Sequence, residues 1–200
     1  MLAKLRPLYN KFMIPMGKAS LKIGFTADMW TLFSLFAAFL AGILLIQGRI
    51  WWGFGLSLVM FAGDMMDGAT ARAKGTLSKF GTVLDHVVDR YAEFIIIGGL
   101  LIGGHISGAV AIFCISGMIM ASYVRAAAES AGGLEDCAVG FAGRLEKLIL
   151  IWLALVFLGV GWKVYAGYLF LLVGLLSHVT AIQRMFYARS KIVGSSIDAG

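Results

Sequence analysis

The 200-residue chain has little charge, little proline and little cysteine. Charged residues make up 14% of it and only 11 residues are acidic, whereas 60% are hydrophobic and the mean hydropathy is +0.89. This composition excludes an ordinary soluble domain and predicts an all-α integral membrane protein. The two cysteines, Cys114 and Cys137, are too few for a disulfide framework or a zinc site. The net charge of +6 is spread over several connections, which argues against nucleic-acid binding and fits anionic lipid and phosphorylated substrates.

Six apolar segments, most of them near the roughly 20 residues that a helix needs to cross a bilayer, predict six transmembrane helices. They cover residues 29–46, 50–70, 80–102, 106–128, 144–160 and 164–186. Polar or glycine-containing breaks lie at 47–49, 103–105 and 159–161, and tryptophans lie beside two of them, as interfacial aromatics do. The sequence therefore predicts one six-helix membrane domain over residues 24–200.

Basic residues are distributed unevenly over the predicted connections. Of the 17 lysines and arginines, only Arg49 and Lys163 fall at the connections assigned to the outside. The other 15 lie at the termini and at the remaining connections with their adjoining helix ends. The positive-inside rule then predicts a multi-pass protein of the cell membrane with both termini in the cytosol.

Residues 1–23 have an amphipathic pattern. Apolar residues recur at helical spacing and lysines share the opposite face, which predicts a juxtamembrane helix lying on the inner leaflet. The apolar set is Leu2, Leu5, Tyr9, Phe12, Met16 and Ile23, and the basic set is Lys4, Lys11, Lys18 and Lys22. Pro7 and Pro15 are expected to break or kink this helix. A solvated basic tail is the alternative interpretation.

Four of the eleven acidic residues are concentrated between residues 64 and 89. Asp64 and Asp67 are three residues apart and Asp85 and Asp89 are four apart, so each pair shares one face of a helix. A carboxylate at the centre of a membrane costs about 2.5–3.5 kcal/mol. Four of them repel one another as well, so positive charge is expected between them. Hard oxygen ligands at this density suit Mg²⁺ or Mn²⁺.

The predicted spans place the four carboxylates at a common depth. If Ile50 lies at the outer boundary, Asp64 lies about 21 Å below it, at 1.5 Å per residue, and about 9 Å from the cytosolic boundary of a core about 30 Å thick. Counted from the cytosolic side at Phe80, Asp85 and Asp89 lie about 8 and 13 Å deep. The site is therefore expected in the inner half of the membrane and open to the cytosol.

The spacing Asp-x2-Asp-Gly-x2-Ala-Arg-x8-Gly-x3-Asp-x3-Asp resembles the signature of the CDP-alcohol phosphotransferase family at every defined position. The resemblance implies transfer of a substituted phosphate from a CDP-alcohol to an acceptor hydroxyl, with release of CMP. It also implies two divalent ions, one bound by Asp64, Asp67 and Asp85 and one by Asp64, Asp85 and Asp89. Asp89 would also act as the general base. Relatives in this family are homodimers, so a homodimer is expected.

The same resemblance implies a CDP-lipid site. The positions that would line it are Gly68, Ala71, Arg72, Ser78 and Gly81. The residues alone leave open whether Arg72 pairs with a diphosphate or an aspartate, and whether Ser78 contacts the CDP-lipid or is a solvated serine. Relatives often carry Thr-Pro-Asn near the nucleotide, and this chain departs from that pattern at Ala27 and Asp28, although Thr26 or Asp28 can cap the helix that follows.

Three arginines lie near the cytosolic ends of the last three predicted spans. Together with Ser122, the arginines Arg125, Arg144 and Arg184 are expected to bind the phosphate of a phosphorylated acceptor. Ordinary positive-inside anchoring is the alternative. The patterns Ser122-x2-Arg125 and Gly143-Arg144-x-Glu146-Lys147 resemble the phosphatidylinositol-phosphate and archaetidylinositol-phosphate synthases, in which the acceptor is inositol phosphate.

Other acceptors and another class of protein remain as alternatives. Glycerol 3-phosphate would need the same phosphate pocket, whereas serine or free inositol would not. Intramembrane acids also mark ion and divalent-metal transporters. A translocation path needs acids in both halves of the membrane, and here they gather in the predicted cytosolic half.

Overall fold

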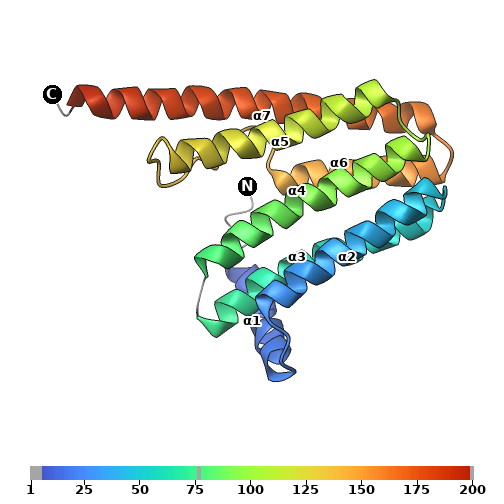
Figure 1. Ribbon diagram of the computed structural model, residues 1–200, viewed down its shortest axis with the longest axis horizontal. Coiled ribbons are helices and arrows are strands. Elements are labelled where there is room, and N and C mark those ends of the chain that lie inside the picture. Colours follow the sequence, from blue (N-terminus) through green and yellow to red (C-terminus); the bar gives the residue numbers. More distant parts are fainter. Residues whose placement is uncertain (1–5, 76–77, 199–200) are drawn as a thin grey trace. The chain divides into compact units, whose positions relative to one another are not determined.

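The computed structural model describes residues 6–75 and 78–198, and their side chains over 13–75 and 78–193. The described residues form helices and no strand (Figure 1). The helices are α1 (Arg6–Lys22), α2 (Ala27–Ile46), α3 (Ile50–Lys74), α4 (Lys79–Ile102), α5 (Gly108–Ser130), α6 (Arg144–Gly159) and α7 (Lys163–Asp198). They divide into two compact units, α1 to α4 and α5 to α7, between Gly103 and Gly104.

Glycines end the helices where the sequence predicts breaks. The connections after α2, α4 and α6 each contain a glycine in the left-handed region, with φ of 74° at Gly48, 70° at Gly104 and 89° at Gly161. A residue with a Cβ is strained there, so the chain turns at these positions. At the start of α2 the backbone N–H of Met29 donates to Oγ1 of Thr26 at 3.3 Å, which confirms Thr26 as the cap.

Three helices of the described chain are long and apolar enough to cross a membrane. They are α2, α5 and residues Lys163–Val193 of α7. The helices α3 and α4 carry the acidic residues that lower their mean hydropathy. With 16 residues, α6 is about 24 Å long, shorter than a hydrocarbon core of about 30 Å. A helical membrane protein is therefore supported, and the six spans stay a prediction.

In the first unit, α2 packs against both α3 and α4 (Figure 1). Small residues allow close approach of α2 and α4, since a Cβ at Gly99 would lie 2.7 Å from the carbonyl oxygen of Gly42. Such glycine contacts are typical of helix pairs in membranes. Because α2 contacts both of its neighbours, it is the scaffold on which the aspartate-bearing helices are placed.

Helix α1 continues through Pro15, so the predicted break does not occur there. Met13, Gly17 and Ser20 are buried, and α1 packs on α3, where a Cβ at Gly17 would overlap the carbonyl of Ala69. This packing offsets the hydrogen bond that proline removes. Met16, one of the apolar residues of the predicted face, is 50% exposed, and an inner-leaflet position stays a prediction.

In the second unit, α7 packs against α5 and α6 and is longer than expected. It runs on from the predicted end at residue 186 to Asp198. The added turns bury Ala188 against Ala128 and Cys137. Cys137 lies in the connection between α5 and α6, residues 131–143, which we call the α5–α6 loop. The docked loop explains why the helix extends beyond the apolar segment.

The α1–α3 contact predicts a local steric effect. Gly17→Val places a branched side chain against the Ala69 backbone, and we expect a loss of about 1–3 kcal/mol, the usual cost of overpacking. The measurement is thermal unfolding of the purified protein in detergent. Gly98→Ala is the matched control, because a Cβ there meets no atom within 4 Å. Equal thermal unfolding midpoints for Gly17→Val and the parent would contradict a tight contact between Gly17 and the Ala69 backbone.

Candidate active site

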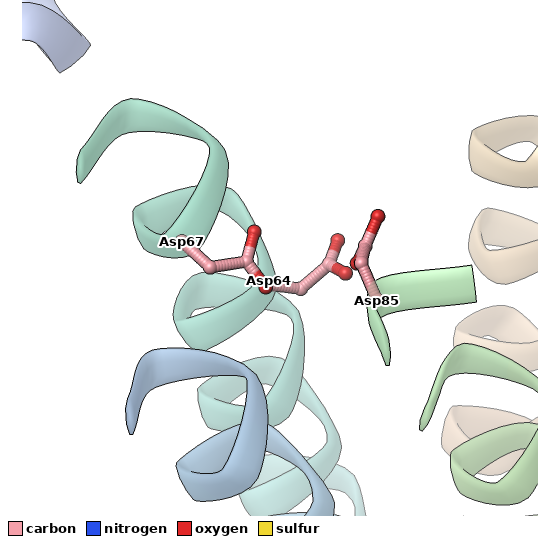
Figure 2. Close-up of side chains that lie close together, drawn as sticks. All are labelled: Asp64, Asp67 and Asp85. Carbon is pink, nitrogen blue, oxygen red and sulfur yellow. The ribbon is translucent and has the colours of Figure 1, made fainter. Parts of the chain in front are cut away.

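Three carboxylates from two helices converge in the first unit. Asp64 and Asp67 project from α3 and Asp85 from α4, and one oxygen of each lies within 4.8 Å of the others (Figure 2). Asp67 is buried and the other two are half-buried. The predicted grouping of these three aspartates is therefore present in the fold.

The spacing of the cluster suits one hard divalent ion. Oxygens on opposite sides of an octahedral Mg²⁺ lie about 4.2 Å apart, twice the metal–oxygen distance. A limit of 4.8 Å needs only a small adjustment of the side chains to reach this geometry. Carboxylate oxygens are the ligand type that Mg²⁺ and Mn²⁺ prefer. The residues present therefore fit the ion.

A hydroxyl from α2 contacts the most buried of the three carboxylates. Oγ1 of Thr31 donates to Oδ2 of Asp67 at 2.8 Å, and both side chains are buried. Sequence reasoning missed Thr31. The available signal was a polar residue one turn into an apolar span, which a membrane helix buries only where it finds a partner.

Asp89 is not part of the three-carboxylate group. It lies on α4, 7% exposed, with Nη2 of Arg90 at 3.8 Å from its Oδ2. Nη1 of Arg90 also lies 2.8 Å from Oε2 of Glu93, so Glu93 is a packed and paired acid. The second predicted ligand set, which contains Asp89, stays a prediction. Sequence reasoning also missed Arg90, because it belongs to no motif or charge pattern that would have singled it out.

Two predicted CDP-lipid positions have clear local roles. Ser78 caps α4 by accepting a hydrogen bond from the Gly81 N–H at 3.1 Å. At Gly68, a Cβ would lie 3.2 Å from Nη1 of Arg72, so the missing side chain leaves room for the guanidinium. Ala71 is half-buried on the same helix. Contacts of these residues with a CDP-lipid stay predictions.

The start of α2 lies beside the start of α4. A Cβ at Gly81 would lie 3.4 Å from Oδ1 of Asp28, which belongs to the first turn of α2. Asp28 is exposed and is one of the two positions at which the chain departs from the Thr-Pro-Asn pattern expected from the resemblance. The departure from the family pattern therefore lies next to a predicted nucleotide-binding position.

In the second unit, two of the predicted acceptor-binding arginines hold the α5–α6 loop. Arg184 donates from Nε to the Val139 carbonyl at 2.8 Å and from Nη1 to the Ala121 carbonyl at 2.6 Å. Arg125 donates from Nε to Oε1 of Glu129 at 2.8 Å. Nη2 of Arg125 also lies 3.4 Å from Oδ1 of Asp136, so Arg125 and Arg184 each contact the α5–α6 loop.

The other two residues predicted to bind the acceptor phosphate, Ser122 and Arg144, belong to the same unit. Ser122 is half-buried on α5, one turn before Arg125. Arg144 is the first residue of α6 and is also half-buried. The structure places these residues on separate elements, and a common phosphate pocket stays a prediction.

Glu129 is a third residue that sequence reasoning missed. Its Oε1 accepts hydrogen bonds from Arg125 and from the Cys137 N–H at 3.0 Å. Asp136 Oδ1 lies 3.4 Å from Nη2 of Arg125 and accepts from the Ala138 N–H at 2.8 Å. These contacts join the arginine to the loop backbone. Burial raises the pKa of the Cys137 thiol above its ordinary value, and the nearby Arg184 opposes this rise.

Comparison with protein families gives a match that covers most of the chain. The model of the CDP-alcohol phosphatidyltransferase family matches residues 25–183. The chain is 35% identical to the archaetidylinositol phosphate synthase of Pyrococcus horikoshii, over 96% of this chain and 98% of that protein. It is 36% identical to the phosphatidylinositol phosphate synthase of Mycobacteroides abscessus, over 92% of this chain and 87% of that protein.

Solved structures of a relative have the same fold. Crystals of the phosphatidylinositol phosphate synthase of Mycobacterium tuberculosis with CDP-DAG bound match with a TM-score of 0.77 and 26% identity, over 89% of this chain and 94% of that one. The same enzyme in complex with manganese and citrate matches with a TM-score of 0.79 and 26% identity, over 90% of each chain.

The loop contacts predict the reactivity of Cys137. Glu129→Ala removes the acceptor shared by Arg125 and the Cys137 N–H, and it removes a negative charge that raises the thiol pKa. We expect maleimide labelling of Cys137, measured in a Cys114→Ala background, to accelerate about tenfold, since a hydrogen bond to a charged group is worth about 1.5–3 kcal/mol. Glu135→Ala, an exposed acid of the same loop, is the control. If Cys137 in Glu129→Ala were labelled at the same rate as in the parent, the proposed role of Glu129 in holding the loop around Cys137 would be contradicted.

Proposed function

Because the chain belongs to the CDP-alcohol phosphatidyltransferase family, we propose that it transfers a phosphatidyl-type group from a CDP-lipid to inositol phosphate and releases CMP. The observation that carries this proposal is the convergence of Asp64, Asp67 and Asp85 within 4.8 Å, in the motif of the family. The choice of acceptor is supported by the two relatives named inositol phosphate synthases, each matched over more than 90% of this chain.

The three clustered aspartates would hold a divalent cation. When bound there, Mg²⁺ or Mn²⁺ would neutralise the diphosphate of the CDP-lipid and stabilise the negative charge on the departing CMP. The manganese complex of the M. tuberculosis enzyme supports a divalent ion. We further propose a second ion, held by Asp64, Asp85 and Asp89.

Asp89 is the proposed general base. Its carboxylate takes the proton from the acceptor hydroxyl, the hydroxyl oxygen bonds to the lipid-bearing phosphorus, and the bond from that phosphorus to CMP breaks. Its burial keeps water away from the carboxylate. Nη2 of Arg90 lies 3.8 Å from its Oδ2.

The donor site is proposed to lie around Gly68, Ala71, Arg72, Ser78 and Gly81. The guanidinium of Arg72 folds over Gly68 and offers planar donors of the kind that bind phosphate. Ser78 fixes the first turn of α4, which carries Gly81. The CDP-DAG complex of the M. tuberculosis enzyme supports a CDP-lipid as donor.

The acceptor phosphate is proposed to bind Ser122, Arg125, Arg144 and Arg184. Arg125 has the most favourable contacts for this role, because its side chain is 37% exposed and its contact with Asp136 is long at 3.4 Å. A phosphate dianion is a stronger partner for Nη2 than this distant carboxylate. Arg184 instead joins the α5–α6 loop to α5, because it donates to the carbonyls of Val139 and Ala121.

We also propose the cellular setting of the enzyme. Both termini and the site are proposed to lie on the cytosolic side of the cell membrane, which the distribution of the basic residues supports. A homodimer is proposed from the family resemblance.

An acceptor panel tests the proposed function. Purified protein is incubated with a CDP-lipid, Mg²⁺ and one of inositol phosphate, glycerol 3-phosphate, serine or free inositol, and CMP release is measured. We expect release with inositol phosphate and none after chelation of the metal. Preference for glycerol 3-phosphate would be consistent with the proposed phosphate pocket but would show that inositol phosphate is not the acceptor. Preference for serine or free inositol would overturn the phosphorylated acceptor.

Substitution of the aspartates separates the base from the metal ligands. Asp89→Asn keeps the shape of the side chain and removes its basicity, so turnover should fall at least about 10²-fold, the low end for loss of a general base. Binding of the CDP-lipid should persist, because Asp64, Asp67 and Asp85 remain. Asp67→Asn should weaken metal and CDP-lipid binding together. Near-normal turnover of Asp89→Asn, with donor and acceptor titrated separately, would refute its role as base.

A further inference from the structure

The carboxylate of Asp67 is held by a residue outside the family motif. Thr31 belongs to α2, and its Oγ1 donates to Oδ2 of Asp67 on α3 at 2.8 Å. Thr31 is 3% exposed and Asp67 is 7% exposed, so water does not compete for this contact. Hydrogen bonds to a charged acceptor are shorter and stronger than those between neutral groups.

The Thr31 hydroxyl has two acceptors within reach and a single proton. The backbone carbonyl of Ala27 lies at 3.2 Å, the usual i−4 partner of a threonine in a helix, and Asp67 lies at 2.8 Å. The shorter contact to the charged oxygen takes the proton. The restricted rotamers of a β-branched side chain, and the packing of α2 on α3 and α4, fix this donor in place.

We propose that Thr31 is a positioning residue for the metal centre: its hydroxyl fixes the Asp67 carboxylate so that Asp67 meets the ion shared with Asp64 and Asp85. A neutral donor suits this role, since it orients the carboxylate and leaves its charge for the cation. Residues that orient metal ligands change metal affinity by about 10–100-fold when removed. The inference rests on the metal-dependent function proposed above.

Binding of Mn²⁺ alone tests this role without reference to turnover. The full chain, purified in detergent and free of lipid and nucleotide, is titrated with Mn²⁺, and the free ion is followed by electron paramagnetic resonance. Thr31→Val keeps the shape and removes the donor, and we expect Mn²⁺ to bind about tenfold more weakly, the low end for losing such a partner. Thr31→Ser keeps the hydroxyl and should restore most of the affinity. Thr31→Ala replaces Thr31→Val if the valine variant does not fold.

Ser34→Ala is the matched control for loss of a buried hydroxyl from α2. Ser34 is 3% exposed, and its Oγ donates to the Thr31 carbonyl at 2.7 Å rather than to a carboxylate. Its Mn²⁺ affinity should equal that of the parent. If Thr31→Val bound Mn²⁺ as tightly as the parent, or if Ser34→Ala lost as much affinity as Thr31→Val, the positioning role of Thr31 would be overturned. The proposed metal centre itself would stand. A parent that binds no Mn²⁺ would overturn the proposed metal centre as well.

The same variants separate positioning from substrate binding. In the transfer reaction, Thr31→Val should raise the Mn²⁺ concentration needed for half-maximal rate and leave the KM for inositol phosphate unchanged. A raised KM for the acceptor with an unchanged metal requirement would contradict the inference, because it would place the effect of Thr31 outside the metal centre.

Discussion

Mutual repulsion among closely spaced carboxylates is the constraint on which the first unit depends. Asp64, Asp67 and Asp85 each bring an oxygen within 4.8 Å of the others, and Asp67 is buried. Like charges at this distance in a poorly solvated site are strongly unfavourable until a cation lies between them. The arrangement therefore favours binding of a cation, and the packing of α3 and α4 on α2 brings the three carboxylates together.

The scaffold meets this constraint with small residues and a fixed donor. Glycines bring α2 close to α4, and α1 packs on the backbone of α3 immediately after Asp67 and Gly68. Thr31 then satisfies one oxygen of Asp67 from α2. In the second unit, Arg125 and Arg184 hold the α5–α6 loop, so the positive charges predicted to bind phosphate also organise the backbone around them. In both units, residues with predicted functional roles therefore also take part in contacts that organise the fold.

The sequence predicted the helices well because glycines at the breaks and the apolar pattern act locally. The aspartate cluster was predictable because its spacing is that of the family motif. Contacts between elements distant in sequence were not predictable, and they include Thr31 with Asp67 and Arg184 with the Val139 carbonyl. Tertiary packing also overrode two local signals, since α1 continues through Pro15 and α7 continues to Asp198. In contacts between distant elements, the sequence around one residue does not indicate which residue it will contact.

The position of the bound metal is the most direct measurement of the central claim. Crystals of the protein grown with Mn²⁺, with diffraction data collected at the manganese absorption edge, give an anomalous difference map. The account predicts a peak within bonding distance of carboxylate oxygens from Asp64, Asp67 and Asp85. A peak adjoining Asp89 would add the second ion. Anomalous density elsewhere, with none at these three aspartates in a protein that retains transferase activity, would contradict the account.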